Sequence, residues 1–287
     1  MGQKGAIHRV EGTTKSEITQ AVQTGLFSSW EDLMPDGHKN QQIFDYFNAL
    51  ASNHYRFMNP PPLRRNHRFI TTRIVFKIHE IEHLMDAVAE HCNGQVLYLL
   101  RHPIATTLSR TLYPRLEHFV HSKYYRTEVL SKNQVREIDT LWSVGSDQQK
   151  GIMSWCFENL IPLRRLQMSE WVTISYEELL LNAESSCQML YRRLDLRNLS
   201  RLLETVGEPS TNIAMSQHDT LQIMQRTDDR ERRKRLVTKW RTKLSENDEK
   251  SAFEILELFG IDVYETGRFA PTKNYLNFPE TARILDS

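Results

Sequence analysis

One segment of the sequence, LLRHPIATTLSR, places a cationic residue where an apolar stretch ends. Arg101 directly follows QVLYLL, and Ser109 offers a hydroxyl on the helix expected to follow. Pro103 suits a turn or the first position of that helix. A guanidinium, a hydroxyl and helix N-terminal amides fit a phosphate monoester, because each supplies a directed donor. The segment predicts an anion site; the alternative is that Arg101 pairs with a surface carboxylate.

Lys77 and His79 close a second apolar segment, IVFKIHE. Because successive side chains of a strand alternate between its two faces, these side chains would share a face and converge on one substrate atom. A basic pair on the protein surface is the alternative interpretation. The pair is therefore a candidate for chemistry at the end of a strand.

The elements that would position these residues are expected to be strands alternating with helices. Residues 69–78, 95–100 and 171–175 are apolar segments typical of strands, and helical periodicity follows the first and the third. Strand–helix–strand units predict parallel strands. We expect an α/β fold, with one parallel β-sheet flanked by helices in a single domain and ligands beyond the carboxyl ends of the strands.

The domain organisation is expected to have three parts. Residues 1–68 are polar and weakly periodic, with SSWEDL and IFDYFNALASNHY as expected helices. Residues 69–265 would form the α/β core, and residues 266–287 a C-terminal tail.

Composition argues against several classes of protein. The chain has 287 residues, and 37 Lys and Arg against 36 Asp and Glu give a net charge of +1. This balance provides no overall field toward nucleic acid or an acidic membrane, so an anion site must be local. Cys92, Cys156 and Cys187 form neither metal-binding pairs nor a disulfide framework. With no apolar run of about 20 residues and no signal peptide, we expect a cytoplasmic protein without membrane, nucleic-acid or metal ligands.

Four segments together resemble sulfotransferases that use 3′-phosphoadenosine 5′-phosphosulfate (PAPS). LLRHPIATTLSR is similar to their 3′-phosphate-binding strand and helix, and IVFKIHE to a strand that ends in K-x-H. WVTISYEELL is similar to a strand followed by Y-E-D/E-L and a helix, and RKRLVTKWRTKLS to an R-K-G loop followed by tryptophan. The resemblance covers about residues 70 to 260.

The resemblance implies a P-loop NTPase-like sulfotransferase fold and sulfuryl transfer from PAPS to a hydroxyl or amine of a small-molecule or carbohydrate acceptor. His79 would remove the acceptor's proton, and Lys77 would stabilise charge on the departing oxygen. Tyr176 would approach the adenine. The residues that would hold the 3′-phosphate are Arg101, Ser109, Arg233 and Lys234.

The sequence departs from the family pattern at Arg235, where glycine is usual. If this loop needs a positive φ there, arginine costs about 1 kcal/mol or more. The alternatives for this basic stretch are a solvated helix or a nucleic-acid patch.

A larger departure concerns the family's N-terminal phosphosulfate loop. The closest fragment is IHRVEGTTKSEITQAV, in which Gly12, Thr13 and Thr14 would form the loop. The strand before them is weak, and Glu11 would repel the phosphosulfate. Three explanations stay open: a loop upstream in a longer enzyme, a degenerate loop here, or a sulfotransferase-fold protein that binds a nucleotide or partner without catalysis.

The general-base role of His79 gives a prediction for any active form of the protein. His79→Ala should lower kcat for sulfuryl transfer by about 10²-fold to 10⁴-fold, because a general base acts in the transition state. Nucleotide affinity should stay nearly unchanged. Steady-state kinetics beside calorimetric binding checks both, and a variant with wild-type kcat would remove His79 from the mechanism.

Overall fold

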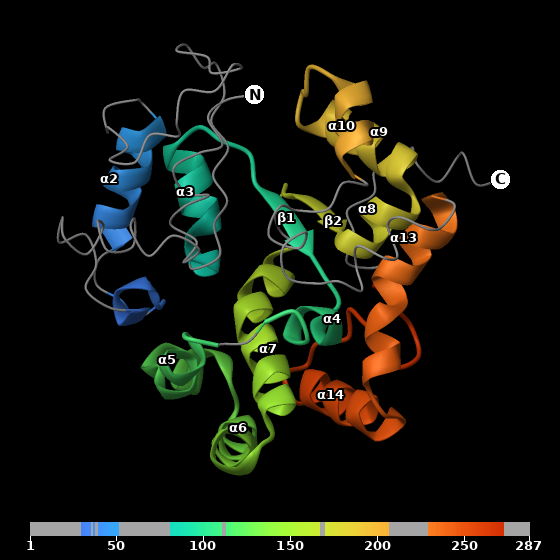
Figure 1. The fold of residues 1–287 in the computed structure, drawn as a ribbon. Helices are drawn as coiled ribbons and strands as arrows, with labels where there is room; N and C mark the ends of the chain where they lie inside the picture. Colours follow the sequence, from blue (N-terminus) through green and yellow to red (C-terminus); the bar gives the residue numbers. More distant parts are fainter. Residues whose placement is uncertain are drawn as a thin grey trace. The chain divides into compact units, whose positions relative to one another are not determined.

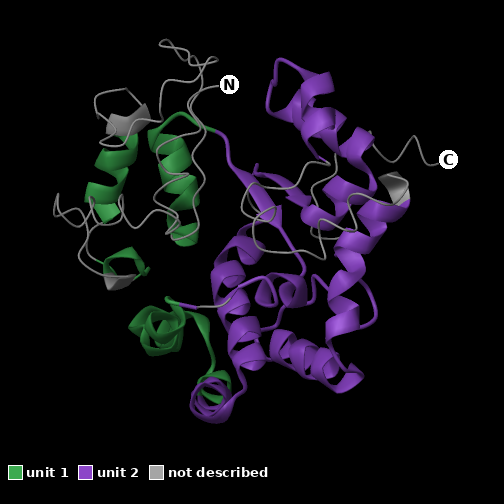
Figure 2. Ribbon diagram, viewed as in Figure 1, with its two compact units in different colours: residues 1–94, 114–135 green, residues 95–113, 136–287 purple. Residues whose placement is uncertain are grey.

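The structure is a computed structural model with two compact units (Figure 2): residues 1–94 with 114–135, and residues 95–113 with 136–287. Its described residues are mostly helical, with one small parallel sheet (Figure 1). No helix among them is both long and apolar enough to cross a membrane. The described residues are 30–35, 37, 40–51, 81–110, 113–166, 170–206 and 229–272.

The sheet consists of two parallel strands, β1 (Leu97–Leu100) and β2 (Val172–Ser175). Their register pairs Leu97 with Val172 and Leu100 with Ser175, so that both strands end at the same edge. The predicted strands at 95–100 and 171–175 and their parallel direction are thereby confirmed. The third predicted strand, at 69–78, lies outside the described residues. The α/β class holds at this coarse level.

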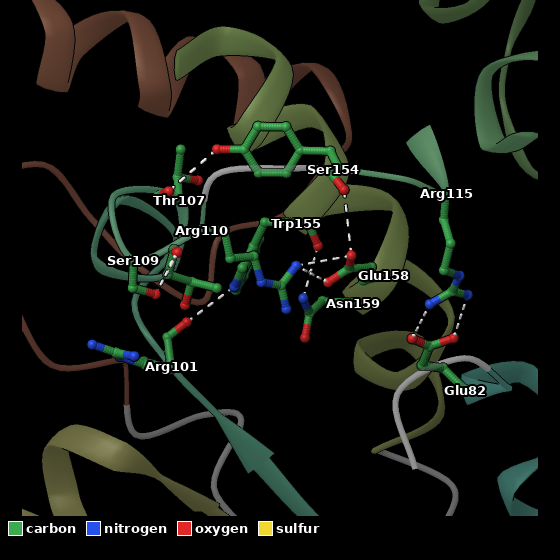
Figure 3. A network of polar contacts seen from close by, with 12 residues as sticks. Glu82, Arg101, Thr107, Ser109, Arg110, Arg115, Ser154, Trp155, Glu158 and Asn159 are labelled. Atoms are coloured by element: carbon green, nitrogen blue, oxygen red, sulfur yellow. Dashed lines mark hydrogen bonds and ion pairs between the residues drawn. The ribbon is translucent and has the colours of Figure 1, made fainter. Parts of the chain in front are cut away.

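The first unit contains short helices, two of which fall where the N-terminal sequence predicts them. Arg115 donates two hydrogen bonds of 2.8 Å to the carboxylate of Glu82, and its guanidinium lies 4.6 Å from the Phe119 ring centroid (Figure 3). This pair fixes the start of α5 against η3. The elements are η2 (Trp30–Leu33), α2 (Asn40–Ala51), η3 (Glu82–Leu84), α3 (Met85–His91), α5 (Leu116–His121) and η4 (Tyr125–Val129).

The second unit is built around the sheet and the long helix α7 (Asp147–Arg165). A capping box starts α7, because Ser146 and Gln149 each bind the other's backbone N–H. The helix packs against α4 and α14 and buries Trp155 and Phe157. Helix α6 (Lys132–Val144) spans the boundary between the units. The other elements are α4 (Pro103–Thr107), α8 (Tyr176–Leu181), α9 (Ala183–Arg193), α10 (Leu199–Val206), α13 (Asp229–Thr238), η5 (Lys239–Lys243) and α14 (Glu246–Leu258).

Gly151 allows α4 and the segment after it to approach α7 closely. A Cβ at this position would lie 2.3 Å from Thr107 Cγ2 and 2.4 Å from the hydroxyl oxygen of Tyr113. Tyr113 in turn donates a 3.2 Å hydrogen bond to the carbonyl of Thr107. A glycine within helix α7 is thus required here by packing.

Gly151→Ala should lower the free energy of unfolding by about 1 to 2 kcal/mol, measured by urea denaturation. Overpacking in a core costs about 1 to 3 kcal/mol, and a Cβ only 2.3 Å from Thr107 places this site in the upper part of that range, from which the roughly 1 kcal/mol that alanine gains over glycine within a helix is subtracted. Gly94→Ala is the matched control, since a Cβ there meets nothing nearer than the Ala89 carbonyl oxygen at 3.8 Å. Equal stability of the Gly151 variant and wild type would contradict this account.

Candidate functional site

The carboxyl edge of the sheet carries Arg101, in the position that the sequence predicts. Arg101 follows β1 directly, and its carbonyl accepts a 3.0 Å hydrogen bond from Trp155 Nε1 of α7. The next residue, His102, donates its backbone N–H to Glu177 Oε1 at 3.0 Å. The backbone that presents Arg101 is therefore fixed from two sides, by α7 and by α8.

The guanidinium of Arg101 lies over the ring of Tyr176, with its Cζ 4.8 Å from the ring centroid. Tyr176 is the first residue of α8 and follows β2, so the parallel register brings the two strand ends together. A cation over an aromatic face is a favourable contact. Arg101 and Tyr176, which the resemblance predicts to bind the same nucleotide, therefore lie in contact in the structure.

Within the described residues, no carboxylate forms an ion pair with Arg101, and its buried Nε has no hydrogen-bond partner. The alternative of a surface ion pair for Arg101 is therefore not observed in this part of the chain. Burial raises the pKa of Tyr176, while the Arg101 charge acts in the opposite direction. A neutral phenol thus lies beside a cation that has no ion-pair partner among the described residues.

Ser109 lies in a turn after α4, because that helix ends at Thr107. Its exposed hydroxyl donates a 2.7 Å hydrogen bond to the carbonyl of Thr106 and retains its lone pairs as acceptors. The neighbouring Arg110 donates two hydrogen bonds, of 2.9 and 2.7 Å, to Glu158 of α7 and so fixes this turn. Figure 3 shows Arg101 and Ser109 on the same side of the turn, away from the Arg110–Glu158 pair.

One expectation for this segment is wrong, because Ser109 lies beyond the end of the helix. The backbone N–H of His102, the residue before the helix, is bound by Glu177.

Glu177 is the polar residue at this edge that sequence reasoning missed. It is 1% exposed, and its second oxygen, Oε2, accepts a 2.9 Å hydrogen bond from the hydroxyl of Tyr264. Burial raises the pKa of Glu177, while the hydrogen bonds from His102 and Tyr264 and the charge of Arg101 lower it. Glu177 lies in the first turn of α8, where a carboxylate favours the helix dipole, and no local pattern in the sequence indicates its distant partners.

His102 is fully buried among aromatic rings. Its ring stacks on Trp240 with centroids 4.4 Å apart and meets Tyr264 edge-on at 4.8 Å. Neither ring nitrogen has a hydrogen-bond partner of good geometry in the described structure. Burial lowers the pKa of His102 to about 3, helped by Arg241 and Arg101 and opposed by the backbone of Arg268. The ring is thus neutral and joins the Arg101 turn to η5.

The basic residues Arg233 and Lys234 lie in helix α13, not in a loop. Lys234 is exposed, whereas Arg233 is half-buried with its Nε unpaired among the described residues. Burial raises the pKa of the Cys187 thiol of α9, and the Arg233 charge opposes this shift. No described hydrogen bond, ion pair or ring contact joins Arg233 or Lys234 to Arg101.

The conditional expectation of strain at Arg235 is also wrong. Arg235 is helical, and its exposed side chain pairs with Glu231 one turn earlier, at 3.3 Å. Since a helix has negative φ, arginine at this position carries no conformational penalty.

The remaining predicted site residues lie outside the described residues, and their roles stay predictions. They are Lys77, His79, Gly12, Thr13 and Thr14. Among the described residues, no three His, Cys, Asp or Glu side chains gather in a way that could hold a metal ion.

Comparisons of the chain with protein-family models, with curated proteins and with solved structures found no match. The resemblance to sulfotransferases therefore rests on its four segments, of which three contain described residues. In two of these, the structure has a strand end followed by a helix, at Arg101 and at Tyr176. In the third, it has a helix where the family has a loop.

The buried neutral His102 should make the protein less stable as pH falls. Its folded pKa of about 3 lies below the ordinary value of 6.5, so between these pH values the unfolded chain binds a proton that the folded chain does not. At pH 5 this costs about 2 kcal/mol relative to pH 7.

His102→Phe keeps an aromatic ring against Trp240 and removes this proton linkage. The variant should therefore lose about 2 kcal/mol less than wild type between pH 7 and pH 5, in urea unfolding at both pH values. An identical loss in both proteins would show that His102 is not buried in its neutral form.

Proposed function

We propose that this chain is a cytoplasmic sulfotransferase of the P-loop NTPase-like fold, which transfers a sulfuryl group from PAPS to a hydroxyl or amine acceptor. The observation that supports it most is the guanidinium of Arg101 over the Tyr176 ring, beyond the ends of two parallel strands and without an ion pair to any described carboxylate. In parallel α/β folds, ligands bind at this edge. A free cation beside an aromatic ring suits a nucleotide, which presents both a phosphate and a planar base.

The geometry favours a phosphate partner for Arg101 over a structural role. A buried nitrogen without a hydrogen-bond partner, as at Arg101 Nε, costs free energy that a purely structural role of Arg101 leaves unexplained. Arg101 itself is partly exposed at this edge, so its side chain is not enclosed in the core. The Ser109 hydroxyl lies in the turn beyond, and Arg233 offers a second unpaired nitrogen on α13.

The reaction proposed is a direct in-line displacement at sulfur. The acceptor oxygen or nitrogen forms a bond to sulfur while the bond from sulfur to the bridging phosphate oxygen breaks, which releases adenosine 3′,5′-bisphosphate. His79 takes the acceptor's proton, and Lys77 stabilises charge on the departing oxygen. Catalysis of this kind depends on positioning and charge dispersal.

A sulfotransferase-fold protein that binds a nucleotide or a partner without turnover is the second candidate. The sequence favours it at one place, where Glu11 precedes Gly12, Thr13 and Thr14 instead of the serine that the family has. A radiolabelled PAPS assay with phenol, alcohol, amine and carbohydrate acceptors separates the two functions. Sulfated product identifies an enzyme, and bisphosphate binding without product identifies a binding protein.

Adenosine 3′,5′-bisphosphate should bind more tightly than AMP, because the 3′-phosphate is the group that Arg101 is proposed to hold. Arg101→Ala should weaken bisphosphate binding by about 1.5 to 3 kcal/mol, the usual scale for a hydrogen bond to a charged group. Isothermal titration calorimetry measures both affinities.

Arg201→Ala is the matched control for this experiment, because Arg201 is an exposed arginine on α10 of the same unit. It should bind both ligands as wild type does. Equal affinities of wild type for the two nucleotides would contradict the proposed function.

A further inference from the structure

We infer that Glu177 is a positioning residue for Arg101, and that it acts by holding the backbone N–H of His102. The inference rests on the proposed binding of a 3′-phosphate by Arg101. Glu177 directly follows Tyr176, whose ring lies beneath the guanidinium. One residue of α8 therefore supports the Arg101 side chain, and the next holds the backbone beside it.

Each oxygen of the Glu177 carboxylate accepts a hydrogen bond from a different segment of the chain. Oε1 accepts from His102 N at 3.0 Å, which fixes the turn directly after Arg101. Oε2 accepts from the Tyr264 hydroxyl at 2.9 Å, which fixes the carboxylate. Both donors are neutral, and no described carboxylate, Glu177 included, forms an ion pair with Arg101.

Tyr264 can act as an anchor because the segment around it, residues 259–272, is held in place. The Thr272 N–H binds the Val263 carbonyl at 2.8 Å, and the Gly267 N–H binds the carboxylate of Glu249 at 2.8 Å. The Tyr264 ring is buried against His102 and Trp155. The hydroxyl thus reaches Glu177 from a fixed position.

Reach and charge of the Glu177 side chain can be separated by two substitutions. Glu177→Gln removes the charge but keeps an oxygen that can accept from the His102 N–H, while the Tyr264 hydroxyl can rotate to accept from the new amide. Glu177→Asp keeps the charge but shortens the side chain by a methylene, so that the carboxylate no longer reaches both donors. A positioning role depends on reach.

The test is calorimetric affinity of the full chain for adenosine 3′,5′-bisphosphate and for AMP. Glu177→Gln should retain the preference for the bisphosphate within about threefold, and Glu177→Asp should lose at least about tenfold of it. AMP affinity should change little in either variant, whereas general damage to the fold would lower both affinities. Glu178→Asp is the matched control, because the Glu178 carboxylate binds Asn182 on the exposed side of α8, at 2.7 Å.

A preference that survives in Glu177→Asp overturns the inference, as does an equal loss in the Gln and Asp variants, which would assign the effect to charge. If Glu177→Asp does not fold, Tyr264→Phe decides: it removes one hydrogen bond from the carboxylate and should reduce the preference about threefold. An unchanged preference there also overturns the inference. Absence of any preference in wild type contradicts the proposed function itself, and so differs from a failure of Glu177 alone.

Discussion

Glu177 places a carboxylate where only 1% of the residue is exposed, and a charge in such a place costs free energy unless donors surround it. Two hydrogen bonds, from His102 and Tyr264, offset this cost. They join α8 to the turn after β1 and to the segment after α14. The edge of the sheet therefore keeps its shape only while these three segments, distant in sequence, remain together.

Aromatic packing extends the same connection to the basic part of the chain. The His102 ring stacks on Trp240 of η5, which follows α13 directly, and α13 packs against α8 through Leu236 and Val237. Because both rings are buried, a shift of η5 would disturb the turn that presents Arg101. The turn and the helix that carries Arg233 are thus parts of one packed structure, although no described hydrogen bond, ion pair or ring contact joins Arg233 to Arg101.

Local patterns predicted the elements of this edge but not the contacts between them. Short apolar segments in the sequence indicate β1 and β2. Because these strands pair in parallel, Arg101 and Tyr176 lie at the same edge of the sheet. The contact of Glu177 with Tyr264 joins residues 87 positions apart and has no periodic signal. At Arg235 the resemblance to a loop misled, although Arg, Lys and Glu favour a helix by intrinsic propensity.

The arrangement also explains how the buried carboxylate of Glu177 can lie near Arg101 without occupying the donors with which Arg101 would bind a ligand. If Glu177 paired directly with Arg101, it would occupy the guanidinium donors. A phosphate would then have to displace the Glu177 carboxylate. Instead, neutral donors from His102 and Tyr264 bind its two oxygens, and burial raises the pKa of Glu177 while the nearby Arg101 charge acts in the opposite direction. The Glu177 side chain therefore lies next to the turn that carries Arg101 without forming an ion pair with it, and Arg101 has no carboxylate partner among the described residues.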